Sequence, residues 1–199
     1  MPCPDLLPAG STPCGGDLVG TWTAAACSLT LAGVATLSGL GFSLECMSAP
    51  VLGSLSVTGT VTFNDDMTYS DNTITTGTST LELAPVCLEI SGTQTTCDVL
   101  ANPLQSLGYD SITCVSNAVT GGCTCSNTIR RDGGLAFVAD NASSSGVYTT
   151  AGNYVTLTSL GDDTEYSYCV SRDAQVLTLS LQTVARIGTV ADPIVLVKP

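Results

Sequence analysis

The strongest constraint on the fold is a period of two in the C-terminal part of the chain. The segment SGVYTTAGNYVTLTSLGDDTEYSYCVSRDAQVLTLSLQ divides into four short runs, separated by turn-forming residues at 151–153, 161–163 and 172–173. Within the runs, apolar residues such as Leu177 and Leu179 alternate with polar ones such as Thr178. Because strand side chains point alternately to the two faces of a sheet, this pattern predicts consecutive antiparallel strands that each bury one face.

The middle of the chain repeats this organisation. SLSVTGTVTFNDDMTYSDN predicts a hairpin turning at 64–66, and DSITCVSNAVTGGCTCSNTIR predicts another turning near 120–122. Residues 84–108 break the pattern and predict short helical turns, limited in length by Pro103. A last strand, PIVLVKP, follows Asp192. About eight to ten strands in sequential hairpins predict an all-β fold, an antiparallel up-and-down barrel, in which closure removes the exposed sheet edges.

The charge and the leader set further limits. The formal net charge is −12, from 5 Lys and Arg against 17 Asp and Glu, so we expect no nucleic-acid or anionic membrane partner.

Residues 18–44 carry no charge, but Ser, Thr and Gly interrupt the run and no basic residue flanks it, which argues against a membrane span. Residues 1–17, rich in Pro and Cys, predict an extended leader before a single domain over 18–199.

Cysteine is the main indicator of compartment. The chain has 10 cysteines, an even number, and they predict disulfides formed in an oxidising space. We therefore expect an extracellular or cell-surface protein whose signal peptide has been removed, because no charged and apolar segment precedes Cys3. All ten are expected to be oxidised: Cys3, Cys14, Cys27, Cys46, Cys87, Cys97, Cys114, Cys123, Cys125 and Cys169.

The spacing of the cysteines suggests particular pairs. Cys114 faces residues 123–125 across a predicted hairpin, so it is expected to pair with Cys123 or Cys125. The same C-x8-C-x-C pattern is compatible with thiolate metal ligands, but a disulfide is favoured in this compartment and no metal is expected. Local loop closure predicts two further pairs, Cys27–Cys46 and Cys87–Cys97.

The only tryptophan, Trp22, lies in the sequence Gly20-Thr21-Trp22 at the start of the first predicted strand. This resembles the G-x-W signature of lipocalin-like (calycin) barrels, and the C-terminal hairpins resemble extracellular bacterial lipocalin-like domains. The resemblance covers residues 19–199 and implies that Trp22 plugs the closed end of the barrel under a basic side chain. Arg186 is the best match for that side chain, with Lys198 as the second choice. The segment 84–108 and the many cysteines depart from plain lipocalins.

The absence of histidine excludes Ser-His and Cys-His nucleophilic pairs and His-based zinc sites. The remaining acidic candidates are expected at turns, where Asp bonds its own backbone and stays in water: Asp65, Asp66, Asp71, Asp162 and Asp163. We therefore assign no catalytic residue and no cofactor.

The alternation instead predicts an apolar inner wall with two phenol groups, suited to a small hydrophobic ligand. It consists of Val155, Leu157, Tyr166, Tyr168, Leu177 and Leu179. The sequence thus favours a secreted binding barrel. One alternative is a structural or interaction subunit of a cell-surface or extracellular assembly, with self-assembly possible. Another is a histidine-free isomerase or cyclase of the calycin type.

Overall fold

Eight antiparallel strands close into a barrel and follow one another around it in chain order, which confirms the predicted up-and-down topology. The structure is a computed structural model that describes residues 12–136, 144–183 and 187–199. In chain order the barrel strands are β1 (Gly20–Ala24), β3 (Ser48–Phe63), β4 (Thr68–Leu83), β9 (Ser145–Ala151), β10 (Tyr154–Ser159), β11 (Asp162–Val170), β12 (Val176–Leu181) and β14 (Ile194–Val197).

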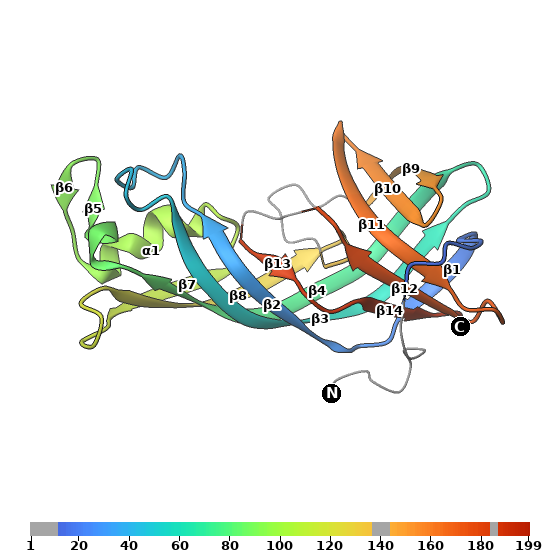
Figure 1. The fold of residues 1–199 in the computed structure, drawn as a ribbon, viewed down its shortest axis with the longest axis horizontal. Helices are drawn as coiled ribbons and strands as arrows, with labels where there is room; N and C mark the ends of the chain where they lie inside the picture. The colour runs from blue at the N-terminus through green and yellow to red at the C-terminus, as the bar shows by residue number, and fades with distance from the viewer. Residues whose placement is uncertain (1–11, 137–143, 184–186) are drawn as a thin grey trace.

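A second sheet region, here called the wing, continues beyond one end of the barrel (Figure 1). Strands β3 and β4 have 16 residues each, too long for the barrel alone. Their far halves, residues 48–56 and 74–83, pair outside the barrel with added strands on both sides. These added strands are β2 (Ser28–Thr36), β13 (Thr189–Val190), β8 (Cys123–Asp132) and β7 (Ser111–Ser116).

The wing is built from insertions between consecutive barrel strands. They follow β1, β4 and β12, and they leave from the end opposite the β3–β4 turn. The insertion after β4 also carries the short elements expected for residues 84–108. These are η2 (Pro85–Leu88), a small hairpin of β5 (Glu89–Ile90) and β6 (Thr93–Gln94), and helix α1 (Cys97–Gln105), which contains Pro103.

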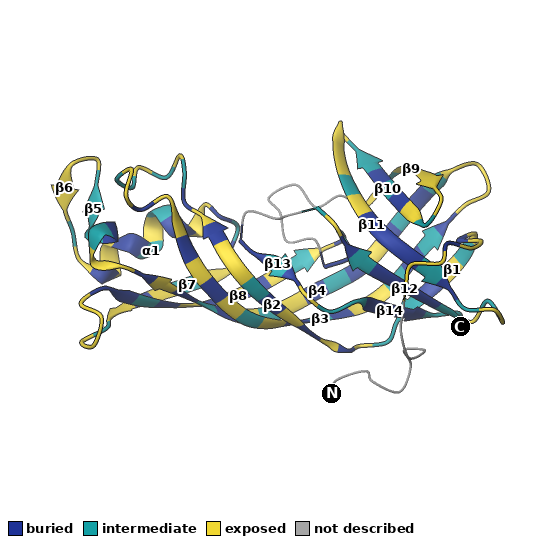
Figure 2. Cartoon of the chain, in the orientation of Figure 1, coloured by how far each residue is buried: buried dark blue, intermediate teal, exposed yellow. Residues whose placement is uncertain are grey.

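One buried face extends from the barrel into the wing. In β3 and β4 every buried residue has an odd number, from Ala49 to Phe63 and from Tyr69 to Leu83. Figure 2 shows the resulting alternation of buried and exposed residues along these strands. The period of two therefore holds over both long strands, and the barrel interior and the inner face of the wing share one hydrophobic core.

Four disulfides join described cysteines: Cys14–Cys169, Cys46–Cys87, Cys97–Cys123 and Cys114–Cys125. The last confirms one of the two expected partners of Cys114. The predicted pairs Cys27–Cys46 and Cys87–Cys97 are wrong, because the wing brings together cysteines that are 41 and 26 residues apart. Cys27 is also in a disulfide, and Cys3 lies outside the described residues.

Trp22 lies on β1 toward the end of the barrel that holds the β3–β4 turn. Its side chain is 0% exposed, and its indole N–H donates to the Leu18 carbonyl at 2.8 Å. The Lys198 ammonium lies 4.9 Å from the ring centroid, which supplies the basic partner expected from the G-x-W resemblance. Arg186, the preferred candidate, lies outside the described residues.

The end of the predicted leader is attached to the barrel. Cys14 is joined to Cys169 on β11, and Gly15 forms a parallel β-bridge with the same residue. The Val170 N–H donates to the Gly15 carbonyl at 2.9 Å. Residues 12–17 therefore lie along the barrel wall and lead the chain to the buried Leu18 beneath Trp22.

Candidate functional site

The six residues predicted to form a ligand wall are all buried, and they come from three adjacent strands. Val155 pairs with Tyr166, and Tyr168 pairs with Leu179, so neighbouring strands place them side by side. Of the polar residues between them, Thr156 is half-buried, whereas Ser167 and Thr178 are buried as well. All six belong to the hydrophobic core, and their role as a ligand-binding wall stays a prediction.

The two tyrosine hydroxyls of this wall bond to different segments of the chain. Tyr168 donates to the Gly16 carbonyl at 3.1 Å, on the segment that runs along the barrel toward Trp22. Tyr166 donates to the Gly134 carbonyl at 3.0 Å and to the Leu135 carbonyl at 3.2 Å. The Tyr166 hydroxyl thus holds a piece of main chain that enters the barrel interior from the β8 side.

This piece, residues 133–136, is here called the insert. All four residues have left-handed backbone angles, with φ of 77° at Gly133, 82° at Gly134, 41° at Leu135 and 65° at Ala136. For a residue other than glycine this conformation costs roughly 1–2 kcal/mol. Leu135 is nevertheless 0% exposed and belongs to the hydrophobic core. Burial of its side chain and hydrogen bonds to its backbone offset the strain.

Asp71 supplies the hydrogen bonds on the other side of the insert. The sequence places Asp71 at a turn in water, and this prediction is wrong: it lies in mid-strand on the inner face of β4, 1% exposed. One carboxylate oxygen accepts the Leu135 N–H at 3.0 Å. The other accepts the Thr73 N–H at 2.8 Å and the Thr73 hydroxyl at 2.6 Å. Asp71 has an odd number, as do the buried β4 residues Tyr69, Leu81 and Leu83. This alternation in the sequence could have predicted that Asp71 faces inward.

Burial raises the pKa of Asp71, although hydrogen bonds from Thr73, Gly134 and Leu135 partly oppose this effect. The single ion pair between described residues is Arg130–Asp132, so no described cation neutralises Asp71. Burial also raises the pKa of Tyr166, and the charge of Asp71 adds to that effect. Both side chains are hydrogen-bonded to groups of the chain itself, Asp71 to Thr73 and Leu135 and Tyr166 to Gly134 and Leu135.

Asp71 and Tyr166 together hold a single peptide group. Asp71 accepts the N–H of the bond between Gly134 and Leu135, while Tyr166 donates to the C=O of that same bond. We call this pair of side chains the clamp. The backbone adds a further tie, because the Gly133 N–H donates to the Thr73 carbonyl at 2.7 Å.

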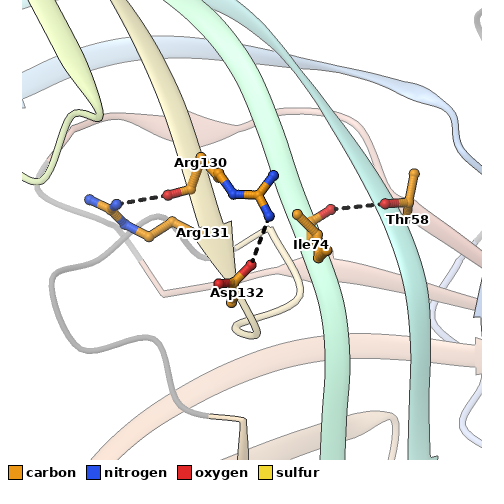
Figure 3. Close-up of polar contacts among 5 residues, drawn as sticks. All are labelled: Thr58, Ile74, Arg130, Arg131 and Asp132. Atoms are coloured by element: carbon orange, nitrogen blue, oxygen red, sulfur yellow. Dashed lines mark hydrogen bonds and ion pairs between the residues drawn. The ribbon is translucent and has the colours of Figure 1, made fainter.

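The end of β8 positions the insert and carries three charged residues (Figure 3). Arg130 and Asp132 form an ion pair of 3.7 Å between exposed side chains. The Arg131 side chain extends to the other side of β8 in Figure 3 and donates to the Arg130 carbonyl at 2.9 Å. Nearby, the Thr58 hydroxyl donates to the Ile74 carbonyl between β3 and β4.

The wing carries a different surface on its outer side. Ser and Thr residues align across five strands in register, and a groove of about 460 Å³ is lined by ten uncharged residues. They are Leu52, Gly53, Ser54, Thr78, Ser79, Thr80, Ser111, Ser126, Asn127 and Thr128. The exposed hydroxyls among them offer hydrogen bonds without charge, whereas Ser79 and Asn127 are buried and bonded to each other.

No protein-family model, curated protein or solved structure matches the chain. The resemblance to lipocalin-like barrels therefore stays a prediction from the Gly20-Thr21-Trp22 sequence, and the structure shows the barrel fold alone. Among the described residues, no helix is long and apolar enough to cross a membrane.

Proposed function

We propose that this chain is a secreted lipocalin-like barrel that binds a small, mostly apolar molecule in its interior. The observation that carries the proposal is the burial of Leu135, a side chain from outside the barrel strands, within the core. The barrel thus accommodates an apolar group of leucine size and holds the adjoining peptide group with the clamp. In the proposed complex the ligand takes the place of the insert.

Two further features support this proposal. The wall of Val155, Leu157, Leu177 and Leu179 offers apolar area on adjacent strands, and burial of such area stabilises a ligand by roughly 25 cal/mol per Å². The four disulfides suit an oxidising environment such as the extracellular space, which fits the secreted part of the proposal.

Binding of the neutral fluorescent probe N-phenyl-1-naphthylamine tests the proposal. We expect a fluorescence increase with the native protein and at least a tenfold loss of affinity in Leu179→Trp, which fills the interior. Val155→Phe is a smaller filling variant in case the first fails to fold. The matched control is Leu52→Trp, since Leu52 is 67% exposed on the wing. Absence of probe binding, or equal binding by the filled variants, would contradict an interior ligand site.

The groove on the wing favours a second candidate, an interaction subunit that assembles with further copies of this chain. A ligand-binding barrel alone does not require such an extension, whereas a hydroxyl-lined groove on a sheet offers hydrogen bonds to another polypeptide. Sedimentation velocity over a range of concentrations tests this candidate. We expect self-association that Thr78→Arg weakens and Thr62→Arg, on the barrel part of the same outer face, leaves unchanged. A monomer at all concentrations would contradict it.

A further inference from the structure

We propose that the ligand of the barrel carries a secondary amide next to a branched apolar group of about leucine size. This inference rests on the proposed function, which it narrows to a chemical class. The insert is the template, because the interior holds it by complementary groups on three sides: an acceptor for N–H, a donor for C=O and apolar side chains around Leu135.

The clamp distinguishes an amide from other polar groups. Asp71 presents a carboxylate oxygen, which is an acceptor only, and it lies 3.0 Å from the Leu135 nitrogen. Tyr166 presents its hydroxyl hydrogen to the Gly134 oxygen at 3.0 Å. These are the two polar atoms of one peptide bond. An ester offers the carbonyl but no N–H, so it would leave a buried carboxylate oxygen without a donor, which is unfavourable in a core.

The charge and burial of the clamp also argue against other polar groups in the ligand. Asp71 is 1% exposed, and no described cation pairs with it. A free carboxylic acid would place a second negative charge beside the first and is disfavoured. A protonated amine would pair with the Asp71 charge but would leave the buried Tyr166 hydroxyl without a carbonyl acceptor. A neutral amide satisfies both clamp residues at once.

The insert competes with any free ligand because it is tethered to the barrel, with an effective concentration in the millimolar range or above. The ligand class is therefore best examined in a variant that expels the insert. Leu135→Glu does this, since a second carboxylate cannot be buried beside Asp71. Leu160→Glu is the matched control: Leu160 also has a left-handed φ, of 52°, but it is 96% exposed in the β10–β11 turn.

Two probes of equal shape test the inference: N-isopentylacetamide, which reproduces the Gly134–Leu135 peptide group with the leucine side chain, and its ester analogue isopentyl acetate. Their affinities are measured by displacement of N-phenyl-1-naphthylamine. In Leu135→Glu we expect the amide to bind at least tenfold more tightly than the ester. Adding Asp71→Asn should reduce this ratio severalfold, and adding Tyr166→Phe should weaken both probes equally, because both contain the carbonyl. Leu160→Glu should bind the probes as the native protein does.

The outcomes separate the two proposals. Equal affinity for amide and ester in Leu135→Glu would overturn the amide class and leave the interior site in place. A preference for the amide that survives Asp71→Asn unchanged would overturn the clamp as its cause. Failure of all three compounds to bind Leu135→Glu, with a native-like thermal melt, would overturn the interior ligand site itself. Leu135→Gln, which brings an uncharged polar side chain into the same apolar surroundings and so also disfavours burial of the insert, replaces Leu135→Glu if that variant does not fold.

Discussion

The ammonium group of Lys198 lies 4.9 Å from the centroid of the Trp22 ring, where the last and first strands of the barrel meet. β14 pairs with β1, so the contact joins the two ends of the described barrel. The indole N–H is bonded to Leu18, and the ring is 0% exposed. Trp22 therefore connects the residue that follows the leader, the first strand and the end of the last strand at one point.

Replacement of this ring is the first prediction. Trp22→Ala should lower the free energy of unfolding by about 3–5 kcal/mol, because a large buried ring is lost and a cavity remains. Lys198→Gln should cost only about 0.5–1 kcal/mol, since it removes a partly exposed cation–π contact. Urea denaturation followed by circular dichroism measures both. A loss below about 1 kcal/mol for Trp22→Ala would contradict the plugging role.

The disulfides give a second prediction. Removal of Cys14–Cys169, with a separation of 155 residues, should cost about 5 kcal/mol, while removal of Cys114–Cys125, with a separation of 11, should cost about 3 kcal/mol, as estimated from loop entropy. Paired Cys→Ser variants compared by urea denaturation test this order. Thiol titration of the denatured native protein should find almost no free sulfhydryl, and several free thiols would also contradict the extracellular assignment.

The burial of Asp71 predicts a specific dependence on pH. Its folded pKa is raised above the ordinary value of 3.8, so the folded state binds this proton more tightly than the unfolded state does. Its contribution to stability is therefore present in acid and is lost as the pH rises through the folded pKa, by about 1.4 kcal/mol for each tenfold difference in proton affinity. Asp71→Asn should remove this decline with rising pH.

Unfolding of the native protein and of Asp71→Asn between pH 3.5 and 7 measures this effect. Hydrogen bonds lower the pKa of Asp66, Asp98 and Asp173, so these exposed groups act in the opposite direction. They are the same in both proteins, and the difference between the two curves isolates Asp71. Parallel curves would show that Asp71 does not titrate in this range.

The close approach of β3 and β4 in the wing gives a further prediction. A Cβ atom added at Gly77 would overlap the Ser54 carbonyl oxygen and the Leu55 side chain, both on the neighbouring strand. Gly77→Ala should therefore destabilise the protein by about 1–3 kcal/mol, as overpacked sites do. The adjacent Thr78→Ala, on the exposed face, should stay within about 0.5 kcal/mol. Equal thermal melts for the two variants would contradict the tight spacing.

Local pattern accounts for what the sequence predicted correctly. The inward orientation of Tyr166, Leu177 and Leu179 follows from alternation between turns, because a two-residue period leaves only one face for the apolar set. The hairpin turn at 64–66 and the pair Cys114–Cys125 depend on neighbours within one hairpin. The burial of Trp22 likewise follows from a short motif at the start of the first strand.

The errors have a common physical origin. Loop length predicts Cys27–Cys46 and Cys87–Cys97. The observed disulfides Cys46–Cys87 and Cys97–Cys123 depend instead on which segments lie side by side in the wing. Asp71 was assigned to a turn because Asp favours turns, but its position on β4 depends on a strand of 16 residues that continues through it.

Residue pattern alone was enough to predict an all-β up-and-down barrel, the buried wall and the oxidised state of the described cysteines, but not which strands belong to the barrel. These features depend on residue type and on spacing over short distances. Three features became visible only in the folded chain: β3 and β4 continue into the wing, Asp71 and Tyr166 hold the same peptide group, and Leu135 is buried in the core. Asp71 and Leu135 are 64 residues apart, and contacts over that distance arise from strand pairing and closure of the barrel, which no local pattern encodes.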